Sequence, residues 1–114
     1  MPASTNSGPL TPTVFHVLLA LSGGALHGYG IMKRVEVDSG IEMGPGTVYG
    51  SLQRLTEAGW IAEAADGDSS DRRRGRTFEL TSAGEAALRA EAARITRLAH
   101  MEPVQRLATD GALS

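Results

Sequence analysis

Four arginines lie close together in residues 71–76, Asp-Arg-Arg-Arg-Gly-Arg, and these are Arg72, Arg73, Arg74 and Arg76. They are four of the eleven basic side chains of the chain. A guanidinium group suits phosphate binding because it offers several N–H donors in a planar fork. Four arginines in a polar loop are, taken alone, most often a solvated run of charge. Their role therefore depends on the elements that hold them.

Residues 44–61 are the second stretch with a chemical signature. The stretch opens on a Gly-Pro pair, ends at Gly59, and places its apolar positions on one face of a helix: Val48, Leu52 and Leu55. The N-terminal part of the other face is nearly bare, with Gly46, Thr47 and Gly50. A glycine inside an exposed helix costs about 1 kcal/mol relative to alanine, which is understandable if a partner approaches the backbone. We interpret the stretch as a DNA recognition helix; the alternative is an ordinary amphipathic surface helix.

The residue types on this helix suit contacts with duplex DNA. In a helix-turn-helix the N-terminal residues of the second helix reach base edges, and free N–H groups there favour a phosphate. Arg54 is expected to reach a phosphate or a guanine, the alternative being an ion pair with Glu57 or Asp38. Tyr49 offers a hydroxyl to the DNA backbone, or is a buried structural tyrosine. The predicted DNA-contacting residues are Lys33, Gly46, Thr47, Tyr49, Gly50, Ser51, Arg54, Arg72, Arg73, Arg74 and Arg76.

The segments before this stretch fit the first half of a helix-turn-helix. Residues 1–10 are predicted to be a disordered arm. A first helix begins at Thr11 as N-cap and is apolar nearly all round, so it needs cover on more than one side. Residues 25–30 are predicted to be a turn, and residues 31–37 a second helix that ends at Gly40.

The segment after Gly59 is predicted to be a wing. Residues 60–64 and 76–80 have the character of two strands, and the loop between them carries the arginines. An isolated hairpin is marginally stable in water, so its apolar side chains are expected to pack on the helices. Trp60, the single tryptophan, is interpreted as a core anchor rather than a ligand platform. The fold class is mainly helical with a small β-hairpin, a winged helix-turn-helix spanning residues 11–81.

A long helix is predicted for residues 82–102, with Ser82 and Glu85 as a capping box and Pro103 ending the helix. Residues 103–114 are predicted to be a short tail with one further turn. Such a helix outreaches a small domain, so we expect it to pair with the same helix and the first helix of a second subunit. The predicted dimer and effector interface comprises Phe15, Leu18, Leu88, Ala92, Ile95 and Leu98.

Composition limits the classes of function. The 114 residues carry no cysteine and have a net charge of −2, which counts mildly against nucleic-acid binding. We expect no membrane span, no secretory signal and a cytoplasmic location. No catalytic or nucleotide-binding motif is present, and the three histidines are far apart in the sequence, so we expect no enzyme, cofactor or metal site. A ligand-binding or protein-interaction module without operator binding remains the alternative.

Several motifs in order resemble the PadR family of bacterial transcriptional regulators. They lie at residues 15–21, 26–31, 46–49, 52, 54–55, 59–61, 72–74 and 80–84. The resemblance implies a dimeric winged helix that binds operator DNA, usually as a repressor, with one C-terminal helix making the dimer. It also implies a response to small aromatic or lipophilic molecules bound between subunits. The chain departs from the family pattern at Trp60, at Gly50 and at the aspartates of the loop before Arg72.

Overall fold

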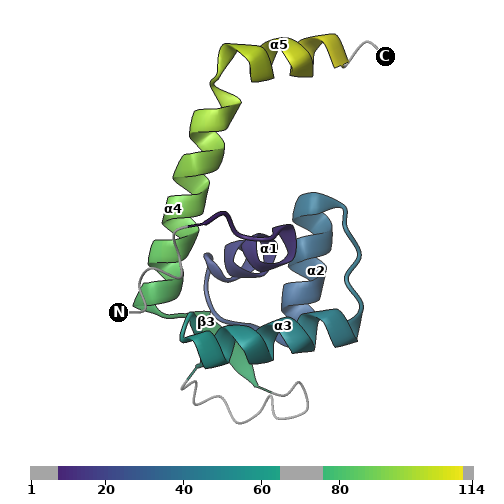
Figure 1. The fold of residues 1–114 in the computed structure, drawn as a ribbon. Coiled ribbons are helices and arrows are strands. Elements are labelled where there is room, and N and C mark those ends of the chain that lie inside the picture. Colours follow the sequence, from purple (N-terminus) through teal and green to yellow (C-terminus); the bar gives the residue numbers. More distant parts are fainter. Residues whose placement is uncertain (1–7, 65–75, 112–114) are drawn as a thin grey trace.

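The computed structural model describes residues 8–64 and 76–111 (Figure 1). A body of helices and a small sheet lies at one end, and two C-terminal helices extend from it. In chain order the elements are α1 (Pro12–Leu21), β1 (Leu26–His27), α2 (Gly28–Ser39), α3 (Pro45–Ala58), β2 (Ile61–Glu63), β3 (Thr77–Leu80), α4 (Ser82–Ala99) and α5 (Glu102–Gly111). The fold is mainly helical with a small antiparallel sheet, a winged helix-turn-helix with a C-terminal helix, as the sequence predicted.

The helix α1 lies at the centre of the body and packs against α2, α3, α4 and β3. Its side chains Val17 and Leu18 have no exposed surface. This explains why the sequence of α1 is apolar nearly all round, because its neighbours cover it on several sides. The predicted inner face of α3 is confirmed: Val48, Leu52 and Leu55 are all buried in the same core.

The sheet has three strands in the order β1-β3-β2, all antiparallel. The predicted hairpin is present, with Ile61 opposite Leu80 and Glu63 opposite Phe78. The prediction of a turn over residues 25–30 is wrong, because Leu26 and His27 pair with Phe78 and Thr77 of β3, and α2 begins directly afterwards. A strand of two residues is too short to show the alternation by which strands are recognised.

The helix ends follow the capping residues of the sequence, with one correction. The Thr11 hydroxyl accepts a hydrogen bond from the Val14 N–H at 3.2 Å, and Gly40 and Gly59 end their helices in the left-handed region. The predicted capping box of Ser82 and Glu85 is wrong, because the N-cap residue is Thr81 and the third helical residue is then Gly84. The hydroxyl of Thr81, not that of Ser82, caps the helix by accepting from the Gly84 N–H at 3.1 Å.

The C-terminal helix is divided into two. The sequence predicted one helix to residue 102 ended by Pro103, but α4 ends at Ala99 and the chain bends at His100 and Met101. Pro103 falls in the first turn of α5, where a proline fits because its missing N–H has no helical partner. Residues 102–111 therefore form a helix of three turns rather than a short turn and tail.

Candidate nucleic-acid interface

The exposed face of α3 begins at a helix end whose N-cap residue is a glycine. Gly44 is the N-cap residue and has no side chain, so it gives the N–H groups of the first turn no side-chain hydrogen bond. Gly46 and Thr47 follow on the exposed side, and a side chain at position 46 would meet no atom of residues 8–64 and 76–111 within 4 Å. This end of α3 is therefore open to a close approach by a partner, with N–H groups and a threonine hydroxyl available as donors.

The middle of α3 corrects one predicted contact. Ser51 is only 1% exposed and lies among the core residues, so its predicted contact with DNA is wrong: it lies on the inner side of the helix. Its hydroxyl is 3.5 Å from Nη2 of Arg54, whose side chain is exposed and lies back along the helix, with Nη1 3.5 Å from the position of a Cβ on Gly50.

The expected alternative for Arg54 was an ion pair with Glu57 or Asp38. Within the described residues those two carboxylates have other neighbours. Asp38 lies 3.9 Å from Arg34, and the Glu57 carboxylate accepts a hydrogen bond from Gln53 at 3.5 Å. The Arg54 guanidinium thus lies on the open face of α3 with a serine hydroxyl, not a carboxylate, as its hydrogen-bond partner in this part of the chain.

Tyr49 is half exposed and is not the buried structural tyrosine that was the alternative. Its ring rests on Gly28, the first residue of α2, where a Cβ would lie 2.5 Å from the tyrosine Oη. On its other side Tyr49 lines a groove between α3 and the sheet, whose other lining residues include Gln53, Glu63, Arg76 and Phe78. The motif glycine at position 28 is thus explained by a contact that sequence alone does not show.

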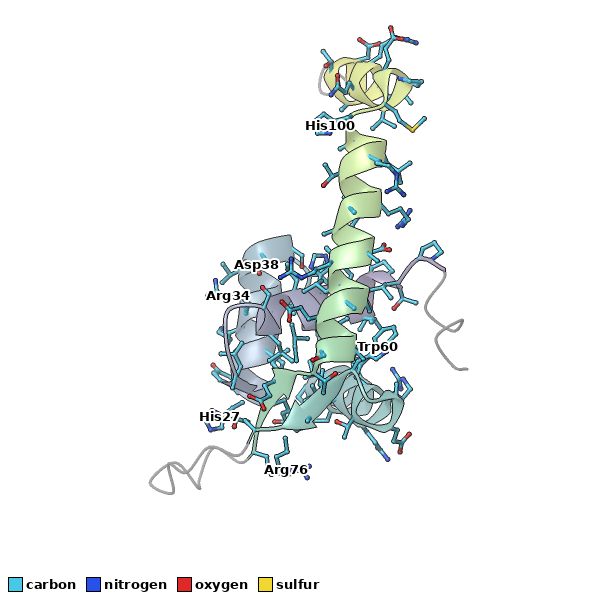
Figure 2. The ribbon with its side chains drawn as sticks, turned by 90° about the vertical axis from the view of Figure 1, so that its left-hand side faces the viewer. His27, Arg34, Asp38, Trp60, Arg76 and His100 are labelled. Atoms are coloured by element: carbon cyan, nitrogen blue, oxygen red, sulfur yellow. The ribbon has the colours of Figure 1, made fainter. Side chains whose placement is uncertain are left out.

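Arg76 is the described member of the four arginines, and it lies at the end of the molecule that carries α3 (Figures 1 and 2). Its guanidinium is 3.8 Å from Glu63 across the hairpin and lies over the ring of Phe78. Both partners are on the sheet, so Arg76 is held beside the groove next to α3. Arg72, Arg73 and Arg74 lie outside the described residues.

The helix α2 adds an aromatic and basic pair to this region. Lys33 is exposed, forms an ion pair with Glu36 at 3.7 Å, and has its ammonium 5.9 Å from the centre of the Tyr29 ring. Tyr29 is 63% exposed and was not among the predicted site residues. Its position next to Gly28 in a motif of the family was the available signal, but exposure cannot be read from a single aromatic residue.

The predicted subunit interface divides into two groups. Leu18 and Leu88 are buried in the core of the chain itself, so their predicted place between subunits is wrong, because they have almost no surface left to offer. Phe15 is half-buried against that core, whereas Ala92, Ile95 and Leu98 are exposed on α4. Three more exposed apolar residues continue beyond them: Met101, Val104 and Leu107.

A buried carboxylate on α4 was also missed. Glu91 is 5% exposed and receives two hydrogen bonds from Arg94, at 3.0 and 2.5 Å. The Arg94 hydrogen bonds, together with one from the backbone of Leu10, hold the pKa of Glu91 below its ordinary value, although burial opposes this. Leu10 and Glu91 line the same groove, between the segment before α1 and the middle of α4.

Two classes of site are absent from the described parts of the chain. Residues 8–64 and 76–111 contain no group of three or more histidines and carboxylates placed to hold a metal ion. No helix in the same residues has the length and apolar character that a bilayer-spanning segment needs.

The family of this chain follows from its sequence and fold together. Residues 17–90, well over half of the chain, match the model of the transcriptional regulator PadR-like family. The chain is also 43% identical over 82 residues to an uncharacterised 37.1 kDa protein in transposon TN4556 of Streptomyces fradiae. That match covers 72% of this chain but only 22% of the relative, so the chain spans about a fifth of the relative's length.

Solved structures share the fold. RosR of H. salinarum superimposes with a TM-score of 0.65 at 22% identity, covering 91% of this chain and 94% of that one. Bacillus subtilis PadR in complex with operator DNA gives 0.56 at 22% identity, covering 72% and 47%. Bordetella bronchiseptica BpsR, whose DNA binding is regulated by 6-hydroxynicotinic acid, gives 0.61 at 27% identity, covering 91% and 72%.

The arrangement defines a winged helix-turn-helix protein of the kind that binds DNA. The chain belongs to the PadR-like family of transcriptional regulators. As a member of this family it is a DNA-binding transcriptional regulator.

Proposed function

We propose that the chain is a homodimeric repressor that places the exposed face of α3 in the major groove of a pseudo-palindromic operator. The observation that carries the proposal is the bare N-terminal half of α3, where Gly46 and Thr47 leave the backbone open. Gly50, Tyr49 and Arg54 extend the same face toward the middle of the helix.

The contacts with the DNA backbone are proposed to come from the flanks of α3. Arg76 lies beside the groove between α3 and the sheet, and Arg72, Arg73 and Arg74 precede it in sequence. Lys33 and the neighbouring Tyr29 are exposed on α2. Phosphate contacts of this kind position a protein without selecting a sequence, so they complement the face of α3.

The dimer is proposed to form through the C-terminal helices. Ala92, Ile95 and Leu98 on α4, with the apolar residues of α5, are exposed in the isolated chain, and burying them against a second copy would remove that apolar surface from water. A small aromatic or lipophilic effector would bind near Phe15, Ile95 and Leu98 and release the operator. The Bordetella relative, which responds to a small aromatic acid, supports this class of effector.

A mobility-shift titration with the duplex upstream of the chain's own gene tests the proposal. We expect a saturable shift at low salt that is lost when Thr47 and Arg54 are both replaced by alanine. Arg89→Ala is the matched control, because that arginine is paired with Glu85 at 2.8 Å on α4, away from the proposed face. Failure of the unmodified chain to shift this duplex or any unrelated duplex would leave a protein-interaction module as the better account.

The effector is tested by adding 6-hydroxynicotinic acid, or a simple phenolic acid, to the shifted complex. Release of the DNA by either compound, and loss of that response in Phe15→Ala, supports a site between subunits. Release that persists in Phe15→Ala contradicts the proposed position of the site.

A further inference from the structure

Gly28, at the start of α2, is in close contact with the ring of Tyr49 on α3. A Cβ on Gly28 would lie 2.5 Å from Oη of Tyr49 and 2.7 Å from both Cε1 and Cζ. Real Cβ atoms do not approach other heavy atoms this closely, so any larger residue at position 28 must displace the outer half of the tyrosine ring. The contacted atoms are the end of a side chain and not backbone, so the ring can move without unfolding the helices.

The position of Gly28 is itself fixed by the sheet. Leu26 and His27 of β1 pair with Phe78 and Thr77 of β3, and Gly28 is the next residue and the start of α2. Gly28 is buried, whereas Tyr49 keeps half of its surface exposed. One side of the Tyr49 ring therefore rests on the fixed backbone of Gly28, and Tyr49 also lines the groove that contains Arg76.

We infer that Gly28 is a positioning residue for DNA binding: its missing side chain provides the seat that holds the Tyr49 hydroxyl at the edge of the recognition face. The inference rests on the proposed function and adds to it a residue that does not itself touch DNA. A tyrosine hydroxyl at this place donates to a phosphate oxygen of the DNA backbone. Without the seat the ring rotates away and that hydrogen bond is lost.

The matched control is provided by the same helix. Gly30 lies two residues further on in α2, and a Cβ there would lie 3.5 Å from Leu26 Cδ2, an ordinary contact distance. Gly30→Ala therefore changes a glycine of α2 to alanine without disturbing Tyr49. Gly28→Ala makes the same chemical change under the ring.

The experiment measures anisotropy of a labelled duplex from upstream of the chain's own gene with four variants. We expect Tyr49→Ala and Gly28→Ala each to weaken binding about tenfold, the size expected for loss of one hydrogen bond to a charged group. Gly30→Ala should bind as the unmodified chain does. The double variant Gly28→Ala with Tyr49→Ala should bind no more weakly than Tyr49→Ala alone, because the seat has no purpose once the ring is gone.

A second measurement is independent of DNA. In the unmodified chain, proton NMR should show a nuclear Overhauser effect between the α-protons of Gly28 and the ring ε-protons of Tyr49, and circular dichroism should show unchanged helix content in Gly28→Ala. Absence of that nuclear Overhauser effect would contradict the contact between Gly28 and the Tyr49 ring. Equal binding by Gly28→Ala and the unmodified chain, or a double variant weaker than Tyr49→Ala, overturns the positioning role while leaving the proposed function intact. An unmodified chain that binds no duplex overturns both.

Discussion

The exposed face of α3 and the exposed apolar set of the C-terminal helices lie at opposite ends of the molecule and differ in chemistry (Figure 1). The face of α3 offers glycine, threonine, tyrosine and arginine, with little apolar surface. The apolar set comprises Ile95, Leu98, Met101, Val104 and Leu107, each at least 39% exposed. A polar, thin surface suits a polyanion that must come close, whereas an apolar surface suits a second protein chain.

The body of helices and sheet between these two surfaces has a core of fully buried side chains. Val17, Leu18, Ile31 and Val35 have no exposed surface, and the helices and sheet around them account for this within one copy. Among residues 92–110, the rest of α4 and the described part of α5, no side chain is buried. The difference teaches that the body folds on its own side chains, while the C-terminal helices are expected to complete their packing with a partner.

The largest effect is expected from placing charge in the apolar set. Leu98→Asp with Leu107→Asp puts two carboxylates where the proposed interface is buried, and an unpaired buried charge is strongly unfavourable. Sedimentation velocity at micromolar concentration should change from dimer to monomer. Gln105→Asp, an exposed polar position on α5, is the control and should leave the dimer intact. A dimer that survives the double change places the interface elsewhere.

The next effect concerns the face of α3. Arg54→Ala should weaken binding to the duplex upstream of the chain's own gene by about 1–3 kcal/mol, if the guanidinium pairs with a guanine. If Arg54 contacts a phosphate instead, the loss should be similar on every duplex and the salt dependence should become shallower. Binding unchanged on all duplexes contradicts a DNA role for Arg54.

Glu91 lies in the middle of α4, hydrogen-bonded to Arg94, and its effect is on stability. Because Arg94 lowers the pKa of Glu91 in the folded chain, the ionised carboxylate stabilises the fold above the unfolded pKa of about 4.5. That stabilisation is lost as the pH falls through the lower, folded pKa. Urea unfolding should therefore show Glu91→Gln less stable than the unmodified chain at pH 7, with the difference shrinking below roughly pH 4. A difference that is constant with pH contradicts an ionic role for this carboxylate.

The smallest effect is expected from Gly50→Ala, which should change stability and DNA binding in opposite directions. A Cβ on Gly50 would lie at an ordinary contact distance from Arg54, so Gly50→Ala fits the folded chain. Alanine is the better helix former, so thermal unfolding should show a gain of up to about 1 kcal/mol. Anisotropy with the same duplex should show weaker binding if the groove approaches this glycine. Unchanged binding would mean that the DNA does not approach Gly50, whose missing side chain then only leaves room for that of Arg54.

The sequence predicted those parts of the fold that rest on local patterns. The inner face of α3, the hairpin, and the end glycines Gly40 and Gly59 follow from periodicity and from backbone conformations that glycine adopts easily. The strand β1 was missed because two residues carry no period. The bend at His100 was missed because Pro103 was taken to end a helix, whereas a proline also fits the first turn of the next helix.

The candidate site was predictable by element but not by side chain. Ser51 is a small polar residue on a helix whose other polar residues are exposed, and only packing shows that it lies inside. Leu18 and Leu88 were predicted to lie between subunits because the sequence does not show which apolar side chains the core of a single copy already buries. The seat of Tyr49 on Gly28 joins residues 21 positions apart, so spacing gives no sign of it.

The most direct test of the central claim, that the face of α3 and its basic flanks bind duplex DNA, is a salt titration of that binding. The logarithm of the association constant should fall linearly with the logarithm of salt concentration, by about 0.9 per phosphate contacted, and the triple change Arg72→Ala, Arg73→Ala and Arg74→Ala should make the slope shallower. An affinity that does not depend on salt would contradict this claim. So would an unchanged slope in the triple variant, if the double variant Thr47→Ala with Arg54→Ala also binds as the unmodified chain does.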